Sequence, residues 1–354
     1  MRRLGSSSLS DPYLIAAFWA GVVATALVLL VCLLIVGLRL ASRRREARWQ
    51  RFVALWRPAL LSVVAAEDAG LPLPPLRRRD GEHFLRLWLY LQESLRGGAA
   101  DQLNEVALRL QVPDMAQRML SRGSRPGQLL ATLALGSLRH RPAWEALLRT
   151  AGRPLPLLSV NAARALVQID PLAAAQQLMP LILSRHDWDT SRVASFLAGG
   201  RQAFWLLLVK VLPSLPPPEA LRGLRLAEAL RLQLPPRVLR TLLDPRRRPE
   251  VIWAALPLAH DDQALQAVRP LLAHPTWQVR QQATTTLARL AGPDDVPALA
   301  ALLEDGRFEV RLAAARGLAA LPFLRPDDLR QLQLQRPGGR DVVRHVLADL
   351  EAAA

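Results

Sequence analysis

A repeat of about 31 residues constrains the fold of this chain more than any other feature. Residues 271–290 and 302–321 share eight identical positions out of twenty at that offset. The identical pairs are Leu271/Leu302, Leu272/Leu303, Val279/Val310, Arg280/Arg311, Ala283/Ala314, Leu287/Leu318, Ala288/Ala319 and Leu290/Leu321. A unit of this length accommodates two short antiparallel helices, and stacked units bury a core that neither helix could bury alone.

Two columns of apolar residues continue the same period upstream. The column of small residues is Ala131, Ala162, Val193, Gly223, Ala254, Ala283 and Ala314, at spacings of 31, 31, 30, 31, 29 and 31. Four residues later stand Leu135, Leu166, Leu197, Ala227, Leu258, Leu287 and Leu318. We expect these columns to mark the second helix of each unit. There the small side chain permits neighbouring helices to approach closely, and the apolar side chain four residues later fills the layer between them.

Composition supports a helical fold. Half of the chain is apolar (51%), but only 5% is aromatic, so leucine and alanine dominate. Both residues favour helices. The predicted fold class is therefore all-α, with a single transmembrane helix followed by an α-solenoid of about seven helix pairs.

The last two units resemble a known repeat family. The pattern LL-x-D-x-x-x-x-VR-x-x-A-x-x-x-L (302–318) is similar to a HEAT repeat of the short, lyase-type form. In that family an Asp in the turn faces an Arg six residues later, and such pairs form a ladder along the solenoid. The resemblance implies this role for Asp305 and Arg311, and for Arg280 one unit earlier, where His274 replaces the Asp.

An uncharged run of 25 residues, from Leu14 to Leu38, precedes the repeats. As a helix it would extend about 37 Å, enough to cross a hydrocarbon core of about 30 Å. The alternatives are a buried core helix and a cleaved signal peptide. Most of the positive charge follows the run instead of preceding it, which is not the arrangement of a signal peptide.

Arginines around this run predict its orientation. Arg2 and Arg3 precede it, and six arginines follow within fifteen residues. The positive-inside rule then places the N-terminus outside and the bulk of the chain in the cytoplasm, as in a single-pass protein of the bacterial inner membrane.

Residues 39–81 are predicted to form a basic juxtamembrane amphipathic helix and a Pro-rich spacer (70–81). The predicted membrane-surface residues, which could meet anionic lipid headgroups, are Arg43, Arg44, Arg45, Trp49, Phe52 and Trp56. In the alternative, the aromatic side packs against the first solenoid helices. The remaining predicted segments are an extracytoplasmic N-terminus (1–13), an N-terminal helical cap (82–124), HEAT-like repeats (125–322) and a C-terminal helical cap (323–354).

No motif for catalysis is present in the sequence. HExxH, GxxxxGK[ST], GxGxxG and GxSxG are all missing, and the lone cysteine, Cys32, lies in the apolar run. The clusters His186–Asp189 and His260–Asp262 could suggest metal, but an Asp before a helix is typical of an N-cap. We therefore expect no enzyme activity, cofactor or metal. The net charge of +16 is uneven, with +7 in residues 1–80 and +9 in the other 274 residues. A modest surplus over so long a domain is typical of solvated surface, so a nucleic-acid partner is not expected.

A binding face is the remaining hypothesis. The second helices of HEAT units line the concave side, and the phase predicts a polar, basic groove there. Its predicted residues are Arg164, Arg192, Arg222, Arg225, Gln282, Thr285 and Arg316. The predicted function is a membrane-anchored cytoplasmic scaffold for a protein partner, such as a polysaccharide glycosyltransferase or a signalling protein. The alternative is a nucleic-acid-binding or enzymatic protein of glycosylase, lyase or hydroxylase type.

Overall fold

The computed structural model describes residues 12–66 and 72–353, in which the regular elements are all helices and none is a strand. The chain divides into two compact units, with the boundary after Met115. Arg2, Arg3 and most of the predicted extracytoplasmic segment lie outside the described residues, as does the start of the predicted spacer.

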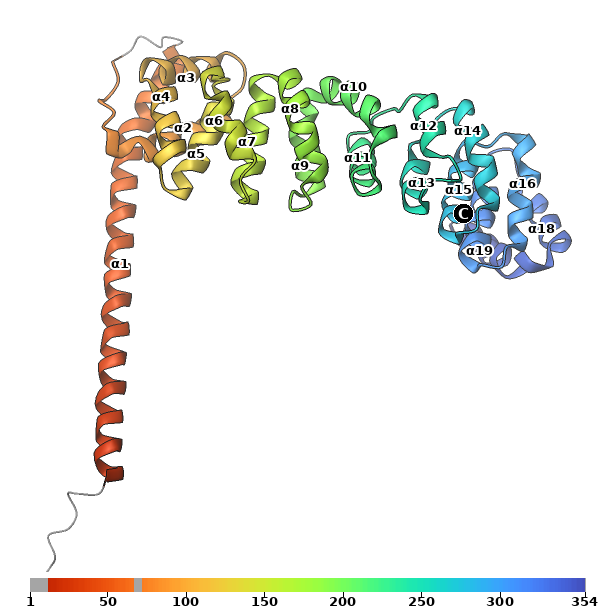
Figure 1. Ribbon diagram of the computed structural model, residues 1–354, viewed down its shortest axis with the longest axis horizontal. Helices are drawn as coiled ribbons and strands as arrows, with labels where there is room; N and C mark the ends of the chain where they lie inside the picture. The colour runs from red at the N-terminus through yellow and green to blue at the C-terminus, as the bar shows by residue number, and fades with distance from the viewer. Residues whose placement is uncertain (1–11, 67–71, 354) are drawn as a thin grey trace, which may run out of the picture. The chain divides into compact units, whose positions relative to one another are not determined.

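The first unit contains a long helix and a small helical cap (Figure 1). Its helices are α1 (Pro12–Ala66), η1 (Arg78–Asp80), α2 (Gly81–Ser94) and α3 (Gly98–Arg109), and α4 (Val112–Arg122) leads into the second unit. The predicted apolar and juxtamembrane segments form one uninterrupted helix of 55 residues, with Pro58 inside it. The apolar side chains from Phe18 to Leu40 are exposed.

The last turns of α1 form the core of the first unit together with α2. Trp56 is only 2% exposed, and its ring centroid lies 5.2 Å from that of Phe84. Phe52 is also buried and stacks on Trp56. The prediction that these two rings face a membrane surface is therefore corrected, because they pack against the first helices of the cap, which was the alternative. Trp49 is half-buried under the guanidinium of Arg86, 4.7 Å from the ring centroid.

The second unit consists of short helices in pairs. We call the first helix of each pair an A helix and the second a B helix. The A helices are α6 (Trp144–Ala151), α8 (Pro171–Ser184), α10 (Arg201–Val211), α12 (Pro236–Leu242), α14 (Asp262–Val268), α16 (Val296–Ala301) and α18 (Pro326–Gln335). The B helices are α5 (Arg125–Ser137), α7 (Pro156–Ile169), α9 (Thr190–Leu197), α11 (Pro217–Ala229), α13 (Pro249–Ala255), α15 (Trp277–Leu290), α17 (Phe308–Ala319) and α19 (Arg340–Ala353). Short 3-10 turns link them: η2 (Arg141–Ala143), η3 (Ala198–Gly200), η4 (Leu212–Ser214), η5 (Leu256–Leu258), η6 (Arg269–Ala273), η7 (Pro293–Asp295), η8 (Leu302–Glu304) and η9 (Pro337–Gly339).

The B helices form one continuous row. Each of them from α5 to α19 packs against the next B helix along the chain (Figure 1). Every member of the predicted small-residue column, from Ala131 to Ala314, lies on a B helix and is buried. The column four residues later is buried as well. The repeat period read from the sequence is thus the period of this row.

Proline and aspartate define where many of these helices begin. Prolines occupy the first helical position of α7, α8, α11, α12, α13 and α18, where the missing N–H would have no intrahelical partner. Asp170 caps α8 by accepting bonds from the N–H groups of Leu172 and Ala173 at 3.1 and 3.0 Å. The bond from the Ala173 N–H, followed by the one from Arg141, holds the pKa of Asp170 below its ordinary value. Short, well-delimited helices are the result.

Candidate partner-binding face

The exposed side of the B-helix row, called here the B face, contains most of the predicted groove residues. Arg164, Arg192, Arg225, Thr285 and Arg316 are exposed, Gln282 is half-buried, and Arg222 is buried. The predicted set is therefore distributed over five B helices and does not form one compact site.

Arg222 is a structural residue, which corrects its place in the predicted groove. Its side chain is 7% exposed and donates from Nε to the carbonyl of Ile182 at 2.5 Å and from Nη2 to that of Trp188 at 2.7 Å. Burial lowers the pKa of its guanidinium, although Asp187 and Asp189 act in the opposite direction. The side chain thus links α11 to the preceding helix pair and is unavailable to a partner.

A groove between α15 and α17 is the clearest concave feature among the predicted residues. It has a volume of about 530 Å³ and is lined by Thr285 and Arg289 from α15 and by Glu309, Leu312 and Arg316 from α17, among others. A Cβ on Gly317 would lie only 2.5 Å from the Cβ of Ala288, so the two helices touch at the floor of the groove. Of the predicted residues, the structure brings together Thr285 and Arg316 here.

The two arginines in the walls of this groove differ in their hydrogen bonds. Arg289 donates to the carbonyls of Ala259 and Pro257 at 2.5 and 3.2 Å, so its guanidinium is bonded to the preceding helix pair. Arg316 is exposed, and its guanidinium has no bonded partner in the described residues. Arg316 is therefore the guanidinium in the groove that remains available to a carboxylate.

Trp253 is an exposed residue of the B face that the sequence reasoning missed. It lies on α13 and is 46% exposed, although tryptophan is usually well buried in a folded domain. Its position directly before Ala254 is equivalent to that of Gln282 before Ala283. The same column that singled out Gln282 would have identified this tryptophan.

The predicted ladder connects consecutive helix pairs, but its Asp–Arg pairing differs from the one that the HEAT resemblance implies. The Asp305 carboxylate accepts from Nε and Nη2 of Arg280 in the preceding unit at 2.7 and 2.9 Å. Arg311 donates to the Asp305 backbone carbonyl at 3.0 Å, and its Nη2 lies 3.7 Å from Asp341 on α19. Burial by itself raises the pKa of Asp305, but the bonds from Arg280 and the Arg307 N–H outweigh it, so the pKa is lowered.

Other arginines tie successive pairs together through carbonyl groups. Arg201 donates to the carbonyl of Arg231 at 2.6 Å, and Arg247 donates to that of Pro213 at 2.5 Å. These bonds satisfy carbonyls near helix ends, which have no intrahelical partner. The arginine-rich composition therefore serves in part to join units, a role that charge counting did not reveal.

The two His–Asp clusters act at helix starts. Asp189 accepts from the Arg192 N–H at 2.9 Å at the start of α9, and Asp261 accepts from the Ala264 N–H at 2.8 Å at the start of α14. The N-cap interpretation is thus observed for both residues. In the described parts of the chain, no three His, Cys, Asp or Glu side chains lie close enough to hold a metal ion.

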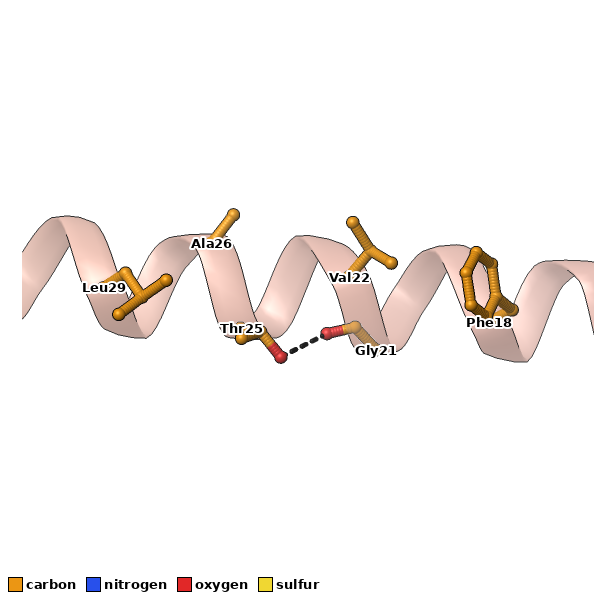
Figure 2. A pocket seen from close by; sticks show the side chains of 6 residues that line it. All are labelled: Phe18, Gly21, Val22, Thr25, Ala26 and Leu29. Carbon is orange, nitrogen blue, oxygen red and sulfur yellow. Dashed lines mark hydrogen bonds between the residues drawn. The ribbon is translucent and has the colours of Figure 1, made fainter.

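Figure 2 shows a shallow, open stretch of surface on the apolar part of α1. It is lined by Phe18, Gly21, Val22, Thr25, Ala26 and Leu29. The Thr25 hydroxyl donates to the Gly21 carbonyl at 2.8 Å, which satisfies it within the helix. Such internal pairing suits a hydroxyl in a hydrocarbon environment.

Two stretches of the described chain have the length and composition of a membrane span. They are Phe18–Ala65 and Thr190–Ser214. The most apolar window of the first is fully exposed, whereas a third of the second is buried, and its helices α9 and α10 pack against α11 and α8. The second stretch is therefore part of the repeat core.

Comparison with known families gives a partial match. A family model of HEAT repeats matches residues 237–321, the region that contains the α15–α17 groove and the Arg280–Asp305 pair. A search of curated proteins found no match. This match and the paired helices support a HEAT-like helical repeat architecture.

Proposed function

For a HEAT-like helical repeat protein with an exposed apolar helix ahead of its repeats, we propose the function of a membrane-anchored scaffold that binds a protein and does not catalyse a reaction. HEAT repeats generally mediate protein–protein interactions. The observation on which the proposal depends is the α15–α17 groove, which combines the free guanidinium of Arg316 with the aliphatic side chain of Leu312.

In this proposal the apolar part of α1 crosses the membrane. Its side chains are exposed over a length sufficient to span a bilayer, and such a surface is stable in lipid but not in water. The arginines that follow the span favour a cytoplasmic location for the repeats, on the inner face of a bacterial membrane. A C-terminal reporter that is active only in the periplasm should stay silent, and activity from it would contradict this orientation.

The groove favours an acidic partner segment that also offers apolar side chains. Arg316 would pair with a carboxylate, while Leu312 would contact an apolar neighbour. Trp253, two B helices before α17, could provide a further aromatic anchor. A membrane-bound enzyme, such as a polysaccharide glycosyltransferase, or a signalling protein is the kind of partner we propose, because confinement near the membrane raises its effective concentration.

A site-specific photo-crosslinker tests this proposal. Placed at Thr285 in the full chain, it should form one dominant protein adduct in membranes, and the substitution Arg316→Glu should reduce that adduct about five-fold or more. The matched control is a crosslinker at Arg240, which is exposed on the A helix α12, with the same adduct expected to be absent.

Two outcomes would overturn the proposed binding groove. One is the lack of any adduct at Thr285 above background. The other is an identical set of adducts at Thr285 and Arg240, since a specific face must discriminate between them.

A further inference from the structure

Two arginine triplets from distant parts of the sequence lie close in sequence to the contact between α1 and α2. We propose that Arg43–Arg45 and Arg77–Arg79 together form a collar that binds anionic phospholipid headgroups and holds this unit against the membrane. This inference rests on the proposed membrane anchor. It extends the lipid contact predicted for Arg43–Arg45 to a second triplet, which the sequence pattern placed in a spacer.

The packing of α2 on α1 joins the segments that follow the two triplets. The ring of His83 lies 5.8 Å from that of Trp49 and 5.8 Å from that of Phe52. Arg45 precedes Trp49 by four residues on α1, and η1, which contains Arg78 and Arg79, directly precedes α2, so both triplets lie close in sequence to this contact. Figure 1 shows the segment before α2 beside α1, at the end of the cap from which the apolar helix emerges.

The collar is positively charged and accessible. All six arginines are exposed, and none of them forms an ion pair within the described residues. The described acidic residues closest in sequence are Glu46, which accepts a bond from Gln50, the half-buried Asp80 and the exposed Glu82. They leave a clear surplus of positive charge facing outward.

The height of the collar fits the headgroup layer of a bilayer. Trp49 follows Leu38 by eleven residues, a rise of about 16 Å along the helix. Headgroups occupy about 5–8 Å beyond the hydrocarbon, and the Debye length at physiological salt is about 8 Å. Arg43–Arg45 follow Leu38 by five to seven residues, about 8–11 Å along the helix, so they lie at the outer edge of the headgroup layer and within one Debye length of it. The segment that carries Arg77–Arg79 leads into α2, whose His83 packs on Trp49.

An anionic bilayer explains these observations better than a soluble partner. The collar directly continues an exposed apolar helix, so any ligand of the collar must coexist with lipid around that helix. Each arginine near an anionic surface improves binding about five-fold, so three arginines together give up to about 100-fold.

Lipid binding to the full chain in detergent provides the test. Native mass spectrometry would count phosphatidylglycerol bound per chain during a titration, with phosphatidylcholine as the neutral probe. The variant R77Q/R78Q/R79Q should bind phosphatidylglycerol about 10- to 100-fold more weakly, with phosphatidylcholine binding unchanged. The variant R43Q/R44Q/R45Q should show the same selective loss, and unchanged helical circular dichroism would show that each variant is folded.

The matched control removes three exposed arginines from the second unit, as R237Q/R240Q/R246Q. It should bind phosphatidylglycerol as the unmodified chain does. The collar is refuted if this control loses as much binding as R77Q/R78Q/R79Q, or if the latter loses none. Equally tight binding of a short DNA duplex through the same triplet would also refute it, in favour of nucleic acid.

Failure of the anchor is distinguishable from failure of the collar. If alkaline carbonate releases the full chain from membranes, the proposed membrane anchor fails. If the chain stays in the membrane while the R77Q/R78Q/R79Q variant keeps its phosphatidylglycerol selectivity, only the collar fails.

Discussion

Replacing Arg222 should destabilise the second unit, whereas replacing Arg225 should not. The two arginines are three residues apart on α11, but Arg222 is 7% exposed and bonded to two carbonyls, and Arg225 is exposed. Sequence reasoning placed both in one groove. The pair therefore provides its own matched control.

The expected magnitude follows from the two bonds of Arg222. Hydrogen bonds from a charged donor contribute about 1.5–3 kcal/mol each, so the gross loss in Arg222→Ala is about 3–6 kcal/mol. Part of this is offset, because the substitution also removes a cation whose burial is unfavourable, as its lowered pKa indicates. We expect a net loss of about 2–4 kcal/mol in the free energy of unfolding, against about 0.5 kcal/mol or less for Arg225→Ala.

Urea unfolding of the full chain in detergent, followed by far-UV circular dichroism, measures this difference. Hydrogen exchange should show the loss first in residues 182–190, which contain both acceptor carbonyls. Arg222→Lys should be intermediate, because an ammonium group lacks the planar fork that reaches both carbonyls. Equal losses for Arg222→Ala and Arg225→Ala, or no loss for either, would refute the structural role.

The Arg280–Asp305 ion pair between successive helix pairs and the close contact of two B helices at Gly136 give two further predictions. Asp305→Asn should cost about 2–3 kcal/mol, because it leaves Arg280 without a charged partner. Since the folded pKa of Asp305 is lowered, the pair stabilises the protein above the unfolded pKa of about 4 and is lost as pH falls further, so the acid branch of a stability–pH curve should flatten in the variant. Gly136→Ala should cost about 1–3 kcal/mol, because its Cβ would lie 2.8 Å from the Cα of Ala165 on the next B helix. Gly199→Ala, which meets no atom within 4 Å, should instead stabilise by about 0.5 kcal/mol, and thermal unfolding compares the two.

Several features of the candidate binding site were accessible from the sequence, and others were not. The phase of the repeat placed Thr285 and Arg316 on exposed positions of B helices, where they line one groove. It did not distinguish Arg222 from its exposed neighbours, because a helical pattern gives the direction of a side chain but not the neighbour it meets. Gly223 lets α11 approach Leu212 and Leu183 closely, and the adjacent Arg222 is buried against the carbonyls of Ile182 and Trp188.

What the sequence determined by itself is local and periodic: helical composition, the 31-residue spacing, the buried columns and the N-caps at Asp189 and Asp261. These features depend on backbone propensity and on side chains a few residues apart, so they can be read from a short segment of the sequence. Tertiary structure decided the pairing of Asp305 with Arg280, the burial of Trp56 and the contact of Trp49 with His83. Such contacts join residues about 25 to 35 positions apart. They depend on how helices pack against one another, and a pattern within one helix cannot encode that geometry.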